Sequence, residues 1–178
     1  AQVASQRVDK IMEGPLEGWL PGIADNSVDL VLCLDVLEHL VDPWATMQEL
    51  YRIVRPGGSV IVSLPNVRNH RVVLPLLFKG DWTYQDAGIM DRTHLRFFTE
   101  AGAKALACHG GFNLASHVST GIRRGDKDYW RNALTLGLLS PLFVFQYVIR
   151  ADKPLTAAQA LPTRKEMAAQ LPEMEHVC

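Results

Sequence analysis

The sequence predicts an α/β protein built around a parallel β-α-β unit. Residues 28–34 and 60–64 are short, almost wholly apolar runs rich in valine, leucine and isoleucine. Apolar residues on both alternating faces are typical of parallel strands that helices cover on both sides. A helical stripe of apolar residues and a Gly-Gly pair separate the two runs. These observations predict an open, mostly parallel sheet with helices packed on it.

The helix between the two strands has clear signals at both ends. Asp42 suits the N-cap and Pro43 the first helical position, where a missing N–H costs nothing. An apolar stripe at helical spacing follows, formed by Trp44, Met47, Leu50, Tyr51 and Val54. We expect Arg55 in the last turn, a stop at residues 56–58, and a second strand that ends at Pro65.

The remaining elements have weaker signals. A short helix is predicted at 72–78, a long loop at 79–93, and a helix capped by Thr99 that runs to about Cys108. Two further strands are predicted at 112–118 and 143–150, with an insertion at 123–139 between them. Residues 1–153 would form one domain, and residues 154–178, which show no strand pattern, a C-terminal tail.

Composition excludes several classes of protein. The 178 residues suit one domain, and a net charge of −1 lacks the basic surplus expected of a nucleic-acid-binding protein. The three cysteines follow neither a disulfide nor a metal-binding pattern, which favours a reducing, cytoplasmic location. The charge-free apolar run at residues 133–149 is shorter than the roughly 20 apolar residues of a membrane helix, so no membrane span is predicted.

The first candidate site follows the first strand. Asp35, Glu38 and His39 are three ionisable groups within five residues, at the strand end where open α/β sheets bind ligands. Beside an apolar strand their pKa values can shift far enough for acid–base roles. The alternative is structural: the two carboxylates cap the next turn, and His39 bonds a backbone carbonyl.

The second candidate site lies in residues 91–99. Arg92, His94 and Arg96 stand beside two phenylalanines and could hold an anionic or sugar-like substrate against an apolar wall. In the structural alternative Arg92 pairs with Asp91 or Asp86, and the aromatic rings are core.

Other constellations are less informative. A third group of arginines, with tryptophans and tyrosines nearby, is more typical of a solvated face; its arginines are Arg68, Arg71, Arg123 and Arg124. The six histidines fall at no metal-ligand spacing, so no metal site is predicted. The sequence contains no GxSxG, P-loop or HExxH motif.

Three segments together resemble the class I S-adenosylmethionine-dependent methyltransferases. They are DLVLCLDVLEHL at 29–40, LYRIVRPGGSVIVSLPN at 50–66 and DRTHLRFFT at 91–99. The resemblance implies a Rossmann-like three-layer sheet of strand order 3-2-1-4-5-7-6 with an antiparallel last strand. It also implies S-adenosylmethionine as cofactor and a small-molecule, glycan or lipid-linked acceptor.

The family's site residues carry over only in part. Leu34, Asp35 and Val36 correspond to the fourth strand's end, beside the methionine portion of the cofactor, and Leu16 lies in a loop that also contacts it. His39 is the first choice for a catalytic base and His94 the second. Arg92 and Arg96 would orient an anionic acceptor. At the position where the family usually has an aspartate facing the adenine, this sequence has Pro15.

The resemblance begins after the family's glycine-rich loop and ribose-binding acid. Residues 7–12 would be the third strand, so strands one and two, which lie between the third and the fourth, are absent from the sequence. Without them residues 28–34 would form an exposed apolar edge, which proteins avoid. We therefore expect a fragment, or an oligomer in which another chain covers this edge.

Two alternatives to an active methyltransferase follow. A catalytically silent, methyltransferase-like binding or scaffolding module is favoured by Pro15 and by the absent glycine-rich loop. A nicotinamide-dependent dehydrogenase would share the α/β layout, but it requires a GxGxxG segment that this sequence lacks.

Overall fold

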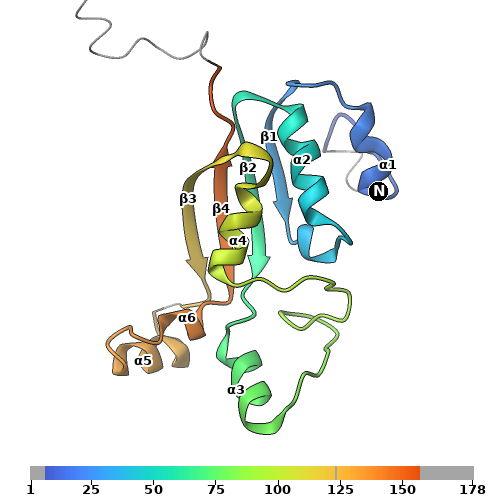
Figure 1. Cartoon of the computed structure of the whole chain (residues 1–178). Coiled ribbons are helices and arrows are strands. Elements are labelled where there is room, and N and C mark those ends of the chain that lie inside the picture. The colour runs from blue at the N-terminus through green and yellow to red at the C-terminus, as the bar shows by residue number, and fades with distance from the viewer. Residues whose placement is uncertain (1–6, 123, 157–178) are drawn as a thin grey trace, which may run out of the picture.

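A four-stranded mixed sheet forms the centre of the computed structural model, which describes residues 7–122 and 124–156 (Figure 1). The strands are β1 (Val28–Leu34), β2 (Val54–Pro65), β3 (Asn113–Thr120) and β4 (Gln146–Asp152), in the order β1-β2-β4-β3. β1 and β2 are parallel, whereas β4 is antiparallel to both of its neighbours. This order is the 4-5-7-6 half of the predicted sheet, and it confirms the predicted fold class.

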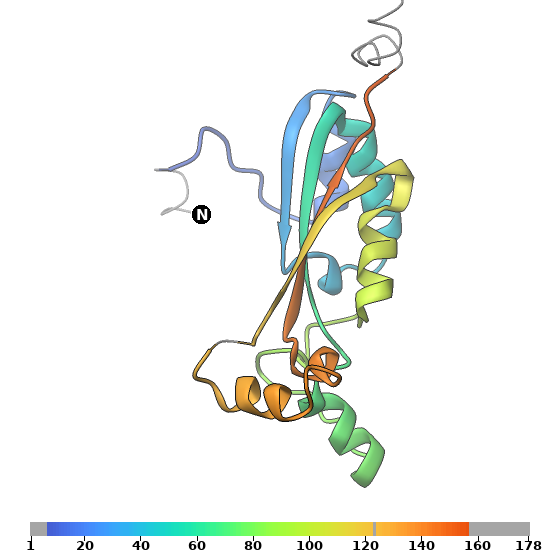
Figure 2. The same cartoon turned by 90° about the vertical axis from the view of Figure 1, so that its left-hand side faces the viewer.

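Two helices, α2 (Pro43–Ile53) and α4 (Glu100–Ala107), pack on one face of this sheet (Figure 2). The other described α-helices are α1 (Leu16–Trp19), α3 (His70–Lys79), α5 (Lys127–Leu134) and α6 (Ser140–Phe143). Short 3₁₀ turns are η2 (Leu20–Gly22), η3 (Leu37–His39) and η4 (His109–Gly111). In Figure 2 α2 and α4 lie side by side against the sheet, while α3, α5 and α6 gather beyond its lower end. None of the described helices is long and apolar enough to cross a membrane.

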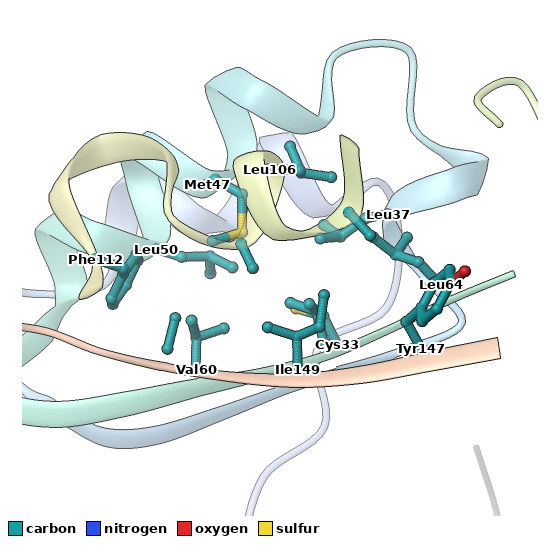
Figure 3. Packing of buried hydrophobic residues seen from close by; sticks show 14 of the residues in the cluster. Cys33, Leu37, Met47, Leu50, Val60, Leu64, Leu106, Phe112, Tyr147 and Ile149 are labelled. Atoms are coloured by element: carbon teal, nitrogen blue, oxygen red, sulfur yellow. The ribbon is translucent and has the colours of Figure 1, made fainter. Parts of the chain in front are cut away.

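The hydrophobic core lies between the sheet and helices α2 and α4. Met47 from α2 and Leu106 from α4 have no exposed surface and face the strands (Figure 3). Cys33, Val60 and Ile149 meet them from three neighbouring strands. The two helices therefore pack on all three of these strands and hold β1, β2 and β4 in one layer.

The sequence predicted that helices cover both faces of β1, but the face opposite α2 and α4 is exposed. Leu30, Leu32 and Leu34 are 49%, 56% and 53% exposed, whereas Cys33 is buried. Successive side chains of a strand point to opposite faces, so the three leucines share the face on which no described helix packs. The prediction of burial on both faces was therefore wrong for the described part of the chain.

Two boundary predictions were also wrong. α2 ends at Ile53, and Arg55 lies in β2 instead of in a last helical turn. The expected stop at residues 56–58 lies within β2, where the chain bulges: Val54 pairs with Val28 and Ser59 with Leu30, and Gly57 has a φ of 78°. Gly57 N–H donates to Lys153 O and Gly58 O accepts from Lys153 N–H, so the residue that follows β4 holds this bulge in place.

The third strand expected at residues 7–12 does not form. The structure describes these residues as turn and irregular backbone, and no described strand pairs with them. A strand requires a neighbour for its backbone hydrogen bonds. The last predicted strand also begins later than expected, at Gln146, because residues 140–143 form α6. The predicted tail lies almost wholly outside the described residues.

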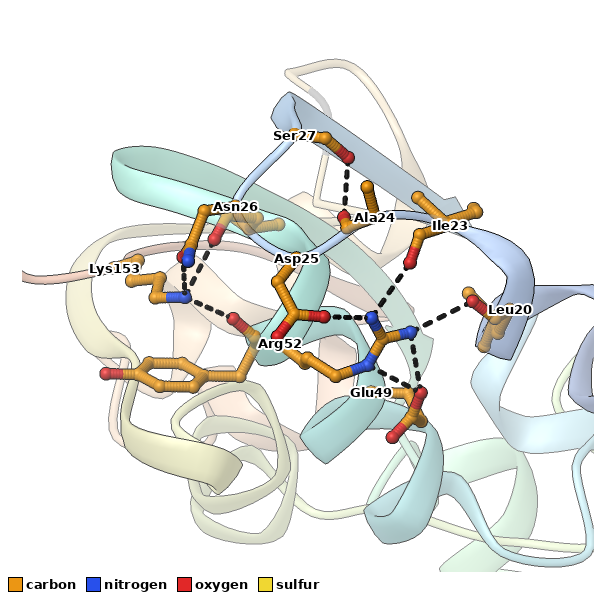
Figure 4. Close-up of polar contacts among 11 residues, drawn as sticks. Leu20, Ile23, Ala24, Asp25, Asn26, Ser27, Glu49, Arg52 and Lys153 are labelled. Carbon is orange, nitrogen blue, oxygen red and sulfur yellow. Dashed lines mark hydrogen bonds and ion pairs between the residues drawn. The ribbon is translucent and has the colours of Figure 1, made fainter.

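A polar network ties the chain before β1 to the end of α2 (Figure 4). The Arg52 guanidinium donates to the carbonyl oxygens of Leu20 and Ile23 at 3.0 and 2.8 Å. It also pairs with Asp25 and with Glu49. This arginine thereby sets the approach of the chain to β1, at the end of the sheet opposite the candidate site.

Candidate functional site

The candidate site begins where β1 ends. Asp35 follows the strand with a left-handed φ of 55°, which turns the chain sharply. Its backbone N–H donates to the Ser63 hydroxyl of β2 at 2.9 Å, and that hydroxyl donates to Asp35 Oδ1 at 3.0 Å. Gln146, the first residue of β4, donates to the same carboxylate oxygen. Three strands thus converge on one carboxylate.

The turn η3 carries the next two site residues. Leu37 has no exposed surface and anchors η3 in the core. The backbone carbonyl of Glu38 accepts from Leu95 N–H at 2.8 Å and from Arg96 N–H at 3.0 Å. These bonds hold the segment after α3 against η3, and they bring together the two predicted sites that the sequence places far apart.

The Glu38 carboxylate is buried without a hydrogen bond. The residue has no exposed surface, and neither carboxylate oxygen has a hydrogen-bond partner among the described residues. The nearest ionisable partner is His94, whose Nε2 lies 3.9 Å from Glu38 Oε1. Burial is the main cause that raises the Glu38 pKa to about 7. At neutral pH this group therefore exchanges readily between its charged and neutral forms.

The two candidate bases lie next to each other. The rings of His39 and His94 meet edge to face with centroids 4.7 Å apart. His39 Nδ1 lies 3.2 Å from Thr93 O, and His94 Nδ1 lies 3.0 Å from Ile89 O. A carbonyl oxygen only accepts, so each Nδ1 carries the proton of a neutral ring and each Nε2 keeps a lone pair. His39 is exposed, whereas His94 is buried.

A cavity of about 260 Å³ opens over this cluster. Its lining comes from the ends of β1 and β2, the segment after α3 and the start of β4: Asp35, Glu38, His39, Pro65, Gly88, Asp91, His94, Phe145 and Gln146. Hydrogen bonds from the side chain and backbone of Thr93 lower the Asp91 pKa. The cavity therefore combines two aspartates with a buried glutamate of raised pKa and two histidines.

The other predicted site residues lie outside this lining. Leu16 and Val36 are partly buried and pack against the main core, and Leu34 is about half exposed. Arg92 forms an ion pair with Asp86, and Arg96 donates to the backbone carbonyl of Val41. The ion pair matches the structural alternative for Arg92, and the substrate-binding role of both arginines stays a prediction.

Sequence reasoning did not assign Ser63, Phe145 or Gln146 to the site. Ser63 bonds Asp35 behind the cavity lining, and as a polar residue within an otherwise apolar strand it could have been identified. Gln146 and Phe145 have no such signal, because only the pairing of β4 with β2 brings them to this end of the sheet. Spacing also predicted no metal site, yet a carboxylate oxygen of Glu38 and one ring nitrogen each of His39 and His94 lie within 4.8 Å of one another.

Comparison with known sequences relates this chain to methyltransferases. The family model for a methyltransferase domain matches residues 1–62. A ubiquinone biosynthesis O-methyltransferase of Cupriavidus pinatubonensis is 33% identical over 89 residues, which are 50% of this chain and 35% of that protein. An uncharacterized methyltransferase of Mycobacteroides abscessus is 49% identical over 41 residues, 23% of this chain and 16% of that protein. The chain spans between about a sixth and a third of these relatives.

Solved structures share the fold. A methyltransferase from Thermotoga maritima, described as S-adenosylmethionine-dependent and a possible histamine N-methyltransferase, aligns with a TM-score of 0.58 at 21% identity, over 85% of this chain and 67% of that one. A second S-adenosylmethionine-dependent methyltransferase, from Archaeoglobus fulgidus, aligns with a TM-score of 0.54 at 17% identity, over 81% of this chain and 67% of that one. None of these matches supports a catalytically silent module.

Proposed function

We propose that the chain is part of a class I S-adenosylmethionine-dependent methyltransferase and that it transfers a methyl group to a hydroxyl of a small-molecule acceptor at the cavity beside η3. The observation that carries the proposal is the pair of adjacent histidines, His39 and His94, at the carboxyl end of a parallel strand. Open α/β sheets bind ligands at this end of their strands.

The end of β1 suits the cofactor's positively charged amino-acid portion. The two hydrogen bonds to the Asp35 carboxylate, from Ser63 and Gln146, both go to Oδ1, so Oδ2 remains to accept from an ammonium group. A bound S-adenosylmethionine would supply an electrophilic methyl on a sulfonium. Leu34 and Val36, on either side of Asp35, and Leu16 are the further cofactor contacts that we propose.

His39 is the proposed base. Methyl transfer to oxygen requires alignment of the acceptor with the methyl group and removal of the hydroxyl proton. His39 is exposed, lines the cavity and keeps the Nε2 lone pair. His94 is the second choice, since only 7% of it is exposed. An ionised Glu38, 3.9 Å from His94 Nε2, would stabilise the positive charge that either ring gains.

The acceptor class rests on the relatives and on two arginines. The ubiquinone biosynthesis O-methyltransferases match up to 73% of the chain, at 26% identity. They favour a small acceptor with a hydroxyl group, while a glycan or a lipid-linked acceptor presents the same nucleophile. Arg92 is exposed and follows Asp91, which lines the cavity, and with Arg96 it would attract an anionic group on the acceptor.

Replacement of His39 by alanine in the full protein tests the proposal. Methyl transfer from labelled S-adenosylmethionine to a panel of phenols and catechols should fall by about 100-fold or more, the usual contribution of a general base. Cofactor affinity, measured by calorimetry, should stay nearly unchanged. His109→Ala, a histidine that contacts Gln48 away from the cavity, is the matched control. Unaltered turnover would reject the base, and an absence of cofactor binding would reject methyl transfer.

A further inference from the structure

Glu38, His39 and His94, which all line the cavity, bring three potential ligand atoms close together. Glu38 contributes a carboxylate with no exposed surface and no hydrogen bond among the described residues. His39 and His94 each contribute a ring nitrogen, and the three atoms lie within 4.8 Å of one another. Buried acceptors that face each other repel unless a proton or a cation lies between them.

The hydrogen bonds of the two rings match the outer contacts of metal-binding histidines. Such a histidine almost always donates its other N–H to a backbone carbonyl, a carboxylate or water. His39 Nδ1 meets Thr93 O at 3.2 Å, and His94 Nδ1 meets Ile89 O at 3.0 Å. Both rings are therefore oriented by the backbone, and both keep a lone pair on Nε2. At His94 this lone pair faces Glu38 at 3.9 Å.

The backbone fixes these three residues with respect to one another. Glu38 O accepts the N–H groups of Leu95 and Arg96, the residues that follow His94. Glu38 and His39 are neighbours on η3, whose first residue Leu37 has no exposed surface. The donor set is therefore held from two chain segments before any ligand binds. Such preorganisation lowers the entropy cost of binding.

We propose that Glu38, His39 and His94 form a binding site for a divalent transition-metal cation. One carboxylate and two imidazoles suit zinc, manganese, iron or cobalt better than calcium or magnesium, which prefer oxygen ligands. Bond lengths near 2.1 Å would draw the three atoms closer than they stand without an ion. His39 and the cavity above it leave the remaining coordination positions open to water or to an oxygen of the acceptor.

The ion would assist the methyl transfer proposed above, and this catalytic role of the ion rests on that proposed function. A hydroxyl coordinated to a divalent cation loses its proton more easily than a free hydroxyl. His39 would then act as a ligand that places the ion, and the released proton would pass to solvent through the cavity. Binding of the ion itself does not depend on methyl transfer, so the two proposals can fail separately.

Cobalt(II) is the probe for the test, because its ligand-field absorption reports nitrogen and oxygen coordination. The full chain is first stripped with a chelator and then titrated with cobalt chloride. We expect saturation at one equivalent. Binding should weaken by at least about tenfold in His39→Ala and in Glu38→Gln, since even the loss of an outer contact of a metal site costs that much. His39 is exposed, so its replacement leaves the core intact.

A matched control uses the other histidine–carboxylate pair at the surface of the sheet. His117 Nε2 lies 3.2 Å from Glu100 Oε1, and both side chains are partly exposed. His117→Ala should bind cobalt like the parent protein. The proposal is overturned if no saturable absorption develops, if His39→Ala binds as tightly as the parent, or if His117→Ala removes the signal. Circular dichroism of each variant confirms that the fold is retained.

Discussion

Ser63 and Asp35 form a closed pair of hydrogen bonds across the ends of two parallel strands. The Ser63 hydroxyl accepts from the Asp35 N–H at 2.9 Å and donates to the carboxylate of the same residue at 3.0 Å. Asp35 has a φ of 55°, a conformation that is uncommon for residues other than glycine. The serine therefore stabilises the sharp turn that directs the following residues into the cavity.

Replacement of Ser63 by alanine should destabilise the protein and loosen this turn. Ser63 is 3% exposed, so the Asp35 N–H would lose its side-chain partner where little water can replace it. We expect the free energy of unfolding in urea to fall by about 1–2 kcal/mol. Ser119→Ala, at an exposed position of β3, should change it by less than about 0.5 kcal/mol. Equal effects of the two changes would contradict the role assigned to Ser63.

Glu38 should make stability depend on pH. Its pKa is about 7 in the folded chain against an ordinary value of 4.5, so the folded state holds this proton to a higher pH than the unfolded state does. The stabilisation from protonated Glu38 is fully present below about pH 4.5 and is lost as the pH rises through 7. Linkage puts the total change on the order of 3 kcal/mol.

Glu38→Gln removes this titration, so it isolates the contribution of Glu38 from that of other groups. Urea unfolding is measured at pH 5 and pH 8 with a chelator present, which keeps the cavity free of cations. The parent protein should lose stability relative to Glu38→Gln as the pH rises. Glu17→Gln, at an exposed position of α1, should track the parent protein at both pH values. A constant difference between the parent and Glu38→Gln would disprove the raised pKa.

Gly58 should not tolerate a side chain. A Cβ at this position would lie 2.8 Å from Asp29 O and from Val54 Cγ1, and 2.9 Å from Arg55 O. Two of these atoms belong to the backbone, Asp29 O on β1 and Arg55 O within β2 itself, so relief requires both a shift of β1 and a change in the bulge at residues 55–58. We expect Gly58→Ala to lower the unfolding free energy by about 1–3 kcal/mol. Gly22→Ala, with no atom within 4 Å of its Cβ, is the control for a glycine replacement.

Asn66 should be required for the wall of the cavity that Phe145 and Gln146 form. Its side chain has no exposed surface, and Nδ2 donates to Pro141 O and to Val144 O, each at 2.9 Å. Asn66→Asp keeps the shape but replaces the donor by an acceptor that faces two carbonyl oxygens. We expect Asn66→Asp to lose at least as much stability as Asn66→Ala, on the order of 2–3 kcal/mol.

Thermal unfolding of both Asn66 variants gives the comparison, and Asn113→Ala at an exposed position of β3 is the control. A stable Asn66→Asp variant would show that the two hydrogen bonds do not determine the position of the segment before β4.

Local signals were sufficient for the central β-α-β unit. The Asp42 carboxylate accepts from Ala45 N–H at 3.0 Å, and the Thr99 hydroxyl accepts from Gly102 N–H at 3.3 Å, so both predicted N-caps are confirmed. The strand at 28–34 and the helix near 72–78 are also confirmed. These elements depend on residues close in sequence, which is why a single sequence reveals them.

Predictions that depended on distant partners were less reliable. The Gly57-Gly58 pair was expected to end the segment in a turn, but it forms a bulge within β2 that is held by hydrogen bonds to Lys153, the residue that follows β4. In the site, polar residues after β1 were correctly expected in a cavity. Burial of the Glu38 carboxylate was not, because it depends on the segment that carries His94. No pattern near residue 38 encodes that contact.

The position of β4 has a consequence for the order in which the molecule acquires its parts. β4 is the last in sequence of the described strands, yet it occupies an interior place between β2 and β3. Its first residue, Gln146, reaches Asp35 across 111 positions of sequence. Contacts of such separation form late, since the intervening chain must first be confined. During synthesis the cavity is therefore completed only after this strand has left the ribosome. Binding of a ligand in the cavity would then indicate that the described sheet has formed completely.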